Sequence, residues 1–373
     1  MSWGHAMVAG MGIVNFRTFT VLLASSILTA SAANGQDRVL LFDSGKVENN
    51  YIRPGEIEEF EVSERGRVWS LVRRVSLPGH RGHRPVLLAD GTRVLWLAES
   101  GASKVLVQYE VATTRASLID IGQFHQDAFL VAEPSASRVA IVEPTRVTFV
   151  DARLSPYSVV LPGPKSTVFR GAAAADGYIA VLRKSSSWDA TDVEVALINA
   201  QTAEVVRILG LPRSYTASVA ISRDAQRLYF YNFSADTFNR SIEIRSLANG
   251  DVLARAAVPG SVGFLEVDER RGALITSESP ASYEHEFVAR DLNTLRRLGF
   301  FALPSSSYWT YRSIHEVKRT QTEGTVLVSS DQWCTYCTGC WDPHIDVFDG
   351  RTFALVKQVE LRHCSAILPL PPR

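Results

Sequence analysis

The sequence predicts an all-β protein, and more specifically a β-propeller built from four-stranded blades. From Arg38 onward, short runs of β-branched and aromatic residues alternate with Gly, Asp and Ser, as in Arg93–Leu97 and Lys104–Tyr109. Runs of this kind are typical of strands. No stretch of a dozen residues keeps a 3.6-residue period, which argues against a helical bundle or an alternating helix–strand protein. The strand-rich unit also repeats along the chain, and such repetition is typical of a propeller.

A turn signal marks each repeat and precedes its second strand. These signals are spaced by 41 to 54 residues and begin at Asp90, Ser135, Asp176, Asp224, Asp268 and Thr322. Each is followed by a strand, a variable loop, and a third and fourth strand that end in turns. Four short strands within this length are typical of one propeller blade. A single blade does not bury both of its faces, so we expect the six units to stack around an axis. A tandem array of two-sheet sandwiches is the alternative architecture.

Strands at the two ends of the chain remain outside these six repeats. Near the N-terminus they are Val39–Phe42, Ile57–Val62 and Arg67–Leu71, and at the C-terminus Ser365–Leu370. We expect them to share a closing blade, because this arrangement closes the ring and covers exposed strand edges. The prediction is therefore a propeller of seven four-stranded blades, with N- and C-terminal strands combined in the closing one.

Residues 1–33 are typical of a secretory signal peptide. Arg17 precedes an apolar run from Thr18 to Thr29, and Ala30-Ser31-Ala32 forms a small-x-small cleavage pattern. The run is shorter than the roughly 20 residues that a membrane span requires. We therefore predict a cleaved signal at 1–33, one propeller domain at 34–373, and export to the periplasm or extracellular space without a stable membrane span. An uncleaved anchor or a buried strand is the alternative.

The charge balance and the missing catalytic motifs narrow the function. The chain carries 39 basic and 39 acidic side chains, so no net field attracts nucleic acid, and we expect no nucleic-acid partner. The sequence contains no Gly-x-Ser-x-Gly, no His-Glu-x-x-His and no phosphate-binding glycine-rich loop. These absences favour a protein that is not an enzyme.

The densest chemistry lies between Asp331 and His344. This stretch and the C-terminal region hold all four cysteines, Cys334, Cys337, Cys340 and Cys364. Cysteines of exported proteins tend to pair, so the first interpretation is structural disulfides, with Cys364 bonded to one member of the loop. A zinc or iron–sulfur site on the same four cysteines and a redox dithiol are the alternatives; otherwise we expect no cofactor. Covalent haem is excluded because Trp341 follows Cys340, where the attachment motif needs histidine.

Two central repeats carry a resemblance to known propellers. A YVTN-type repeat resembles the segments Asp224–Tyr231, Ile242–Gly250 and Val258–Gly260. The heavy chain of bacterial methylamine dehydrogenase is similar to the segments Thr191–Val195, Leu209–Arg213 and Leu228–Ser234. The resemblance covers about two blades and implies a periplasmic, seven-bladed propeller of the quinoprotein amine dehydrogenase-like group. In that family the heavy chain supports a small quinone-bearing light subunit.

The resemblance also implies that loops between second and third strands share one face with the links between blades. On this face we expect the cysteine loop and a binding surface for a ligand or partner, whose candidate residues are His80, His83, Arg84, His125, Trp188, Arg213, Tyr215, Tyr308, Trp333, Trp341 and His363. The histidines are either metal ligands or general bases at the channel mouth, or independent loop residues. The tryptophans mark either a partner surface or packing between blades.

These observations favour one function over two others. The first hypothesis is an exported, non-catalytic propeller that binds an unknown protein or small molecule through the face with the cysteine loop. The alternative is a periplasmic electron-transfer subunit resembling the amine dehydrogenase heavy chain. The third is a lactonase-like hydrolase, because related propellers include such enzymes.

Overall fold

A computed structural model of the chain describes most of residues 36–371. The stretches outside the described residues are 1–35, 44–45, 49–50, 54, 78–84, 136–137, 152, 163–167, 185–192, 216–217, 280–285, 303–309, 321–323, 335–340, 350–353, 361–365 and 372–373, and beside some of them only the backbone is described. The chain divides into two units, Met1–Asn34 and Gly35–Arg373. The predicted signal peptide lies outside the described residues.

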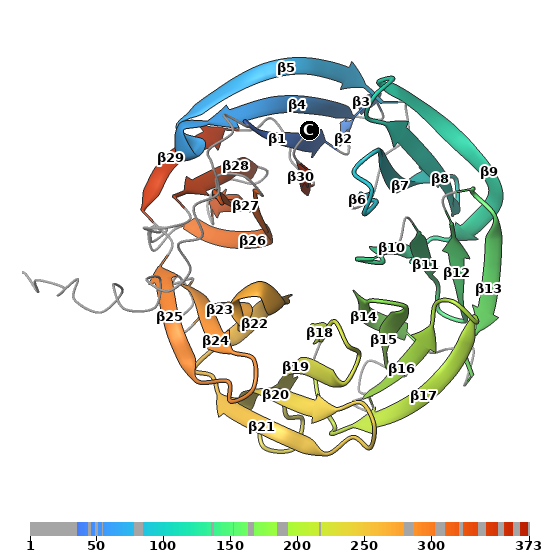
Figure 1. The fold of residues 1–373 in the computed structure, drawn as a ribbon, viewed down its shortest axis with the longest axis vertical. Helices are drawn as coiled ribbons and strands as arrows, with labels where there is room; N and C mark the ends of the chain where they lie inside the picture. The colour runs from blue at the N-terminus through green and yellow to red at the C-terminus, as the bar shows by residue number, and fades with distance from the viewer. Residues whose placement is uncertain are drawn as a thin grey trace, which may run out of the picture. The chain divides into compact units, whose positions relative to one another are not determined.

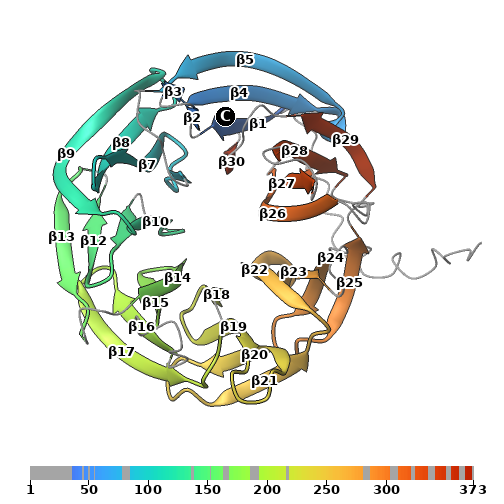
Figure 2. The same ribbon diagram turned by 180° about the vertical axis from the view of Figure 1, so that it is seen from behind.

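The second unit is a ring of seven four-stranded antiparallel sheets (Figures 1 and 2), which confirms the predicted propeller. We number its blades along the chain. Blade 1 contains β6 (Val86–Leu87), β7 (Arg93–Ser100), β8 (Ser103–Glu110) and β9 (Arg115–His125). Blade 2 contains β10 (Phe129–Ala132), β11 (Val139–Val142), β12 (Arg146–Val150) and β13 (Pro156–Val160). Blade 3 contains β14 (Val168–Ala175), β15 (Tyr178–Lys184), β16 (Val193–Asn199) and β17 (Glu204–Leu211).

The remaining repeats form three further blades with the same strand order. Blade 4 contains β18 (Val219–Ile221), β19 (Arg227–Phe233), β20 (Arg240–Ser246) and β21 (Val252–Ala257). Blade 5 contains β22 (Ser261–Asp268), β23 (Ala273–Ser279), β24 (Glu286–Asp291) and β25 (Arg297–Ala302). Blade 6 contains β26 (Thr310–Arg319), β27 (Val326–Cys334), β28 (Trp341–Phe348) and β29 (Leu355–Glu360). The predicted turn signals precede the second strands of these blades.

The closing blade combines both ends of the propeller, as predicted. Its order is β30 (Ala366–Leu370), β1 (Asp37–Asp43), β4 (Glu56–Ser63) and β5 (Val68–Ser76). The C-terminal strand β30 is innermost, and Leu368 pairs with Leu40 on β1. A two-stranded hairpin, β2 (Lys46–Glu48) and β3 (Tyr51–Arg53), interrupts the connection from β1 to β4. The ring thus closes through main-chain bonds between the two ends of the chain.

Each blade is buried on both of its faces by its neighbours. The five residues Val94–Ala98 of β7 are all at most 1% exposed, which explains why this strand has an unbroken apolar sequence. Between the closing blade and blade 1, the rings of Phe42 and Trp96 meet edge to face, with centroids 5.3 Å apart. The outermost strands are mostly exposed to solvent. In β17, for example, Leu209 is the one buried residue. The hydrophobic core therefore lies between blades, around the whole ring.

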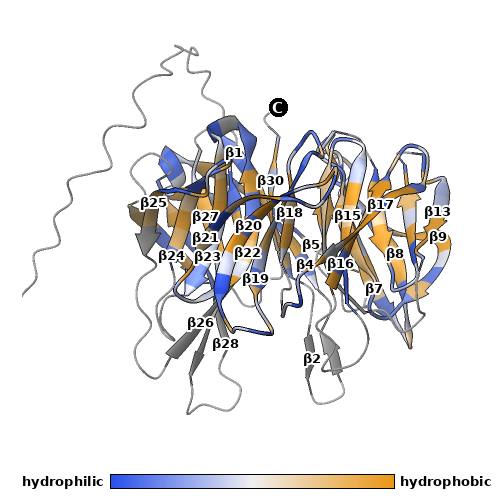
Figure 3. Ribbon diagram, turned by 90° about the horizontal axis from the view of Figure 1, so that it is seen from below, coloured by the Kyte–Doolittle hydropathy of each residue, from blue (hydrophilic) through white to orange (hydrophobic). Residues whose placement is uncertain are grey.

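The antiparallel strands give the ring two distinct faces. Links between blades and loops between second and third strands lie on one face, which we call the loop face. Turns between first and second, and between third and fourth, strands lie on the other, which we call the turn face. Seen from the side, the strands run between these two faces (Figure 3). No helix in the described part of the chain is long and apolar enough to cross a membrane.

Candidate functional site

Most of the predicted binding residues lie outside the described residues. These are His80, His83, Arg84, Trp188, Tyr308 and His363, together with Cys337, Cys340 and Cys364. The disulfide interpretation and its metal-binding alternative therefore stay predictions. Among the described residues there is no group of three or more His, Cys, Asp or Glu side chains that would hold a metal ion.

The cysteine loop joins the second and third strands of the last repeat, where the sequence placed it. Strand β27 ends at Cys334 and β28 begins at Trp341. The backbone register pairs Trp333 with Trp341 across these strands, and it pairs Cys334 with Thr310 on β26. The ladder therefore continues up to the base of the loop, on the loop face.

His125 is the one predicted histidine that the structure describes with its side chain. It ends β9 on the loop face, and its ring is half exposed. The backbone N–H of Asp127 donates to its Nδ1 over 3.1 Å. Its own backbone N–H donates to the buried carboxylate of Glu143 over 2.9 Å. The described contacts of His125 are thus those of a local turn, and the role of the histidines on this face stays a prediction.

Tyr215, by contrast, belongs to a cluster of aromatic rings on the loop face of blade 4. Its ring centroid lies 5.3 Å from that of Phe233, which in turn lies 6.2 Å from Phe238. Tyr215 is 44% exposed and Phe238 is 66% exposed. We call these three residues the aromatic patch. Solvent-exposed aromatic clusters of this kind are typical of surfaces that bind partners.

The backbone around the patch explains how residues distant in sequence meet. The isolated bridge between Ser214 and Ser234 joins the link entering blade 4 to the turn after β19. The N–H of Tyr215 donates to the carbonyl of Phe233 over 2.9 Å. The turn itself is closed by the N–H of Ser234 donating to the carbonyl of Asn239, again over 2.9 Å. These bonds hold the inter-blade link and the loop between β19 and β20 together as one surface.

Cationic side chains border the patch. The Lys184 ammonium lies 5.5 Å from the ring centroid of Tyr215, and the Arg240 guanidinium lies 5.0 Å from that of Phe233. Arg213, another predicted residue, forms an ion pair with Asp236 over 3.0 Å. Contacts between cations and aromatic faces are attractive, and arginine most often makes them. The structure therefore brings the predicted Arg213 and Tyr215 together with residues that the sequence analysis did not select.

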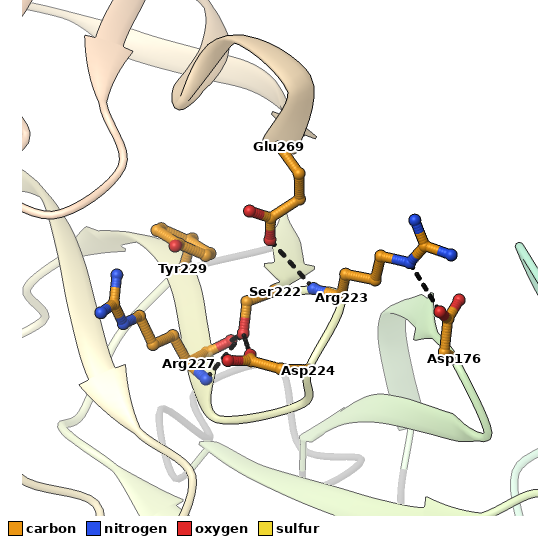
Figure 4. Close-up of a pocket in the computed structure, with 7 residues that line it drawn as sticks. All are labelled: Asp176, Ser222, Arg223, Asp224, Arg227, Tyr229 and Glu269. Carbon is orange, nitrogen blue, oxygen red and sulfur yellow. Dashed lines mark hydrogen bonds and ion pairs between the residues drawn. The ribbon is translucent and has the colours of Figure 1, made fainter.

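A second feature, a pocket, lies on the opposite face. It is a hollow of about 590 Å³ on the turn face of blades 3, 4 and 5, lined by Asp176, Ser222, Arg223, Asp224, Arg227, Tyr229 and Glu269 (Figure 4). The Arg223 Nε donates to Asp176 over 2.6 Å, and the backbone N–H of Arg223 donates to Glu269 over 3.0 Å. The pocket is therefore crossed by polar bonds between consecutive blades.

The charges of this pocket are compensated within it. The hydrogen bond and the negative charge of Asp176 raise the pKa of Arg223 above its usual value. The Ser222 hydroxyl, which donates to Asp224 over 2.6 Å, lowers the pKa of that carboxyl. Both groups therefore keep their charges at neutral pH. Asp176 and Asp224 belong to the predicted turns before the second strands, and their recurrence in adjacent blades was the available sequence signal for this pocket.

Comparisons with known proteins support the fold. No protein-family model matches the sequence, and no curated protein is similar to it in sequence. Among solved structures, a protein from Lactobacillus plantarum has a TM-score of 0.60 at 10% identity, over 90% of this chain and 100% of that one. The β-propeller domain of Myceliophteria thermophila Cps50 (Swd1) has a TM-score of 0.54 at 12% identity, over 77% of this chain and 88% of that one.

A third similar structure is a dehydrogenase. The dihydro-heme d1 dehydrogenase NirN has a TM-score of 0.52 at 15% identity, over 89% of this chain and 74% of that chain. At these identities the likeness concerns the fold alone. Together with the seven blades, it shows that the chain has the fold of a seven-bladed β-propeller.

Proposed function

We propose that this protein is an exported, non-catalytic binding module that recognises a partner protein through its loop face. The observation that carries the proposal is the aromatic patch, in which Tyr215 and Phe238 expose 44% and 66% of their surface around Phe233. The residues that contribute most to the affinity of protein–protein interfaces are often aromatic residues and arginine. Arg240 stands against this patch, so both residue types are present in one place.

Export is part of this proposal and is supported by the N-terminal sequence pattern. Expression of the full chain with its own N-terminus, followed by N-terminal sequencing of the secreted or periplasmic material, tests it directly. Cleavage after Ala32 or Ala33 is the expected result, and a protein retained at full length in the cytoplasm would contradict it. Thiol counting on the same material, with and without reductant, tests the disulfides: four free thiols without reductant would exclude them.

Selection from a random peptide library on the immobilised protein tests the binding function. Peptides enriched by the wild type should not be enriched by the double variant Tyr215→Ala/Phe238→Ala. The matched control is Phe300→Ala, because Phe300 is 48% exposed and also lies under an arginine, Arg297, but belongs to the outer strand β25. Selection that yields no peptide dependent on Tyr215 and Phe238 would refute a binding role for the patch.

The amine dehydrogenase-like alternative gives a different result in a simple experiment. An electron-transfer subunit of that kind requires a quinone-bearing partner, which is expected to co-purify in a fixed ratio and to stain for quinone. A lactonase-like hydrolase would instead turn over lactone substrates in the purified propeller. Both activities are absent under the proposed function.

A further inference from the structure

We propose that the aromatic patch binds a short acidic segment of its partner, anchored by one aromatic or large aliphatic side chain. This inference rests on the proposed function, because it names the chemistry of the partner at the same surface. It follows from three properties of the described residues: the exposed rings, the charges beside them and the fixed backbone that presents them.

The rings provide the place for an anchor. Phe233 is partly buried and lies in contact with both Tyr215 and Phe238, which stand beside it and are more exposed. An apolar side chain that packs against the exposed parts of these rings would remove aromatic surface from water. Removal of apolar surface from water is the main source of affinity at protein interfaces.

The charges around the rings are predominantly positive. Arg213 and Arg240 are exposed at the patch, whereas Lys184 lies buried beside Tyr215, and Asp236 is the carboxylate paired with Arg213. The whole chain has no net charge, with 39 basic and 39 acidic side chains. Because Asp236 offsets Arg213, the positive character of the exposed surface comes from Arg240. A partner that matches it carries carboxylates next to its anchor, because complementary charge steers association and disfavours wrong partners.

The backbone fixes the patch before a partner arrives. Phe238 has a φ of +55°, in the left-handed region that glycine and asparagine adopt most readily. Its N–H nevertheless donates to the carbonyl of Ser234 over 3.0 Å, so the turn is well formed around it. Because Phe238 is mostly exposed, its side chain contributes little to the stability of the fold, and the turn presents it to solvent. A fixed surface loses little entropy on binding.

Three labelled nine-residue peptides test the inference by fluorescence anisotropy. Each has one central tryptophan, and its other eight positions are Glu and Asp, Gln and Asn, or Lys. The acidic peptide is expected to bind at least about tenfold more tightly than the neutral one, and its affinity should fall as salt rises from about 50 to 300 mM. Replacement of its tryptophan by alanine should abolish binding.

Charge reversal in the protein supplies the second arm. Arg240→Glu should weaken binding of the acidic peptide by about tenfold or more and strengthen binding of the lysine peptide. Arg240→Gln, which removes the charge without reversing it, should lose an intermediate amount of affinity. It keeps the test valid if Arg240→Glu does not fold. Arg115→Glu is the matched control, because Arg115 is also exposed but begins β9 on the turn face; it should leave every affinity unchanged.

The outcomes separate this inference from the proposed function. Equal binding of neutral and acidic peptides, lost in Tyr215→Ala/Phe238→Ala but kept in Arg240→Glu, would overturn the acidic partner and leave the binding module standing. Preference for the lysine peptide would overturn it as well. If none of the three peptides binds at about 1 mM while the library yields patch-dependent peptides, the inference again fails alone. Failure of the library too would refute the function itself.

Discussion

Replacement of Gly66 by alanine tests how the propeller ring is closed. Gly66 ends the short 3-10 turn Glu64–Gly66 between β4 and β5 of the closing blade, and its φ is +90°. A Cβ atom at this position would lie 2.5 Å from Cγ1 of Val347 and 2.8 Å from Cγ2 of Thr325. Both of these residues belong to blade 6 and are fully buried. The added methyl group would therefore be forced into the interface between the last repeat and the closing blade.

Two costs add up at this position. A left-handed backbone costs an L-residue about 1–2 kcal/mol, and an extra methyl group in a packed interior costs about 1–3 kcal/mol. We therefore expect the free energy of unfolding of Gly66→Ala to fall by about 2–5 kcal/mol. The control is Gly122→Ala, since Gly122 has a similar φ of +98° but no atom within 4 Å of its would-be Cβ. The free energy of unfolding of this variant should fall only by the backbone cost, about 1–2 kcal/mol.

Equilibrium unfolding in urea, followed by tryptophan fluorescence and circular dichroism, measures both variants. The difference between them reports the contact across the closing interface, free of the backbone cost that they share. If Gly66→Ala and Gly122→Ala were equally stable within about 0.5 kcal/mol, the close contact of Gly66 with blade 6 would be refuted. A changed slope of unfolding against urea would indicate that the ring no longer unfolds as a unit.

Three further predictions concern other parts of the structure. The Tyr109 hydroxyl is buried and has no hydrogen-bond partner among the described residues, so Tyr109→Phe should leave stability at pH 7 unchanged or raise it by up to about 1 kcal/mol. Burial also raises the pKa of Tyr109. The unfolded chain therefore loses this proton first, and the stability of the wild type should fall above about pH 10. Unfolding measured at pH 9 and 11 should show a smaller loss of stability in Tyr109→Phe than in the wild type. Arg290 binds Glu278 through two hydrogen bonds of 2.8 and 3.0 Å in the interior of blade 5. Arg290→Ala leaves the buried carboxylate without this partner and should lower the free energy of unfolding by about 3–5 kcal/mol, whereas the double variant Glu278→Leu/Arg290→Met should lower it less. A single variant more stable than the double variant in urea unfolding would contradict this prediction. Phe238→Gly and Phe238→Ala should lose peptide binding equally. In thermal unfolding the glycine variant should be more stable by about 1 kcal/mol, because the φ of residue 238 is +55°. Equal stability of the two variants would refute the strained turn.

Local patterns were sufficient to predict the ring. Asp90-Gly91 and Asp176-Gly177 form tight turns in which glycine has a positive φ, and such turns depend on a few adjacent residues. The period-two runs between them correspond to strands that pair with their sequence neighbours. Even the closing blade followed from the count of strands left at the two ends, because a ring of four-stranded blades closes when these strands pair with one another.

The proposed binding surface was predicted only in part, because it depends on contacts between segments. Arg213 and Tyr215 were selected as residues of an inter-blade link, whereas Phe233 and Phe238 belong to β19 and the turn after it. Only the bridge between the link and this turn brings the rings together. Buried charges such as Glu278 were missed for a similar reason. In an alternating strand a carboxylate indicates a solvent-facing position, and its partner on the neighbouring strand is visible only once the register is known.

The two faces of the ring differ in a way that supports a division of tasks. On the turn face, polar groups join consecutive blades: the N–H of Gly177 donates to Glu133 over 2.8 Å, and Arg223 connects Asp176 to Glu269. These groups are largely used in holding blades together. On the loop face of blade 4, Phe238 is mostly exposed, so its ring contributes little to joining blades. Exposed loop-face residues that are not needed to join blades are the ones on which the proposed binding function rests.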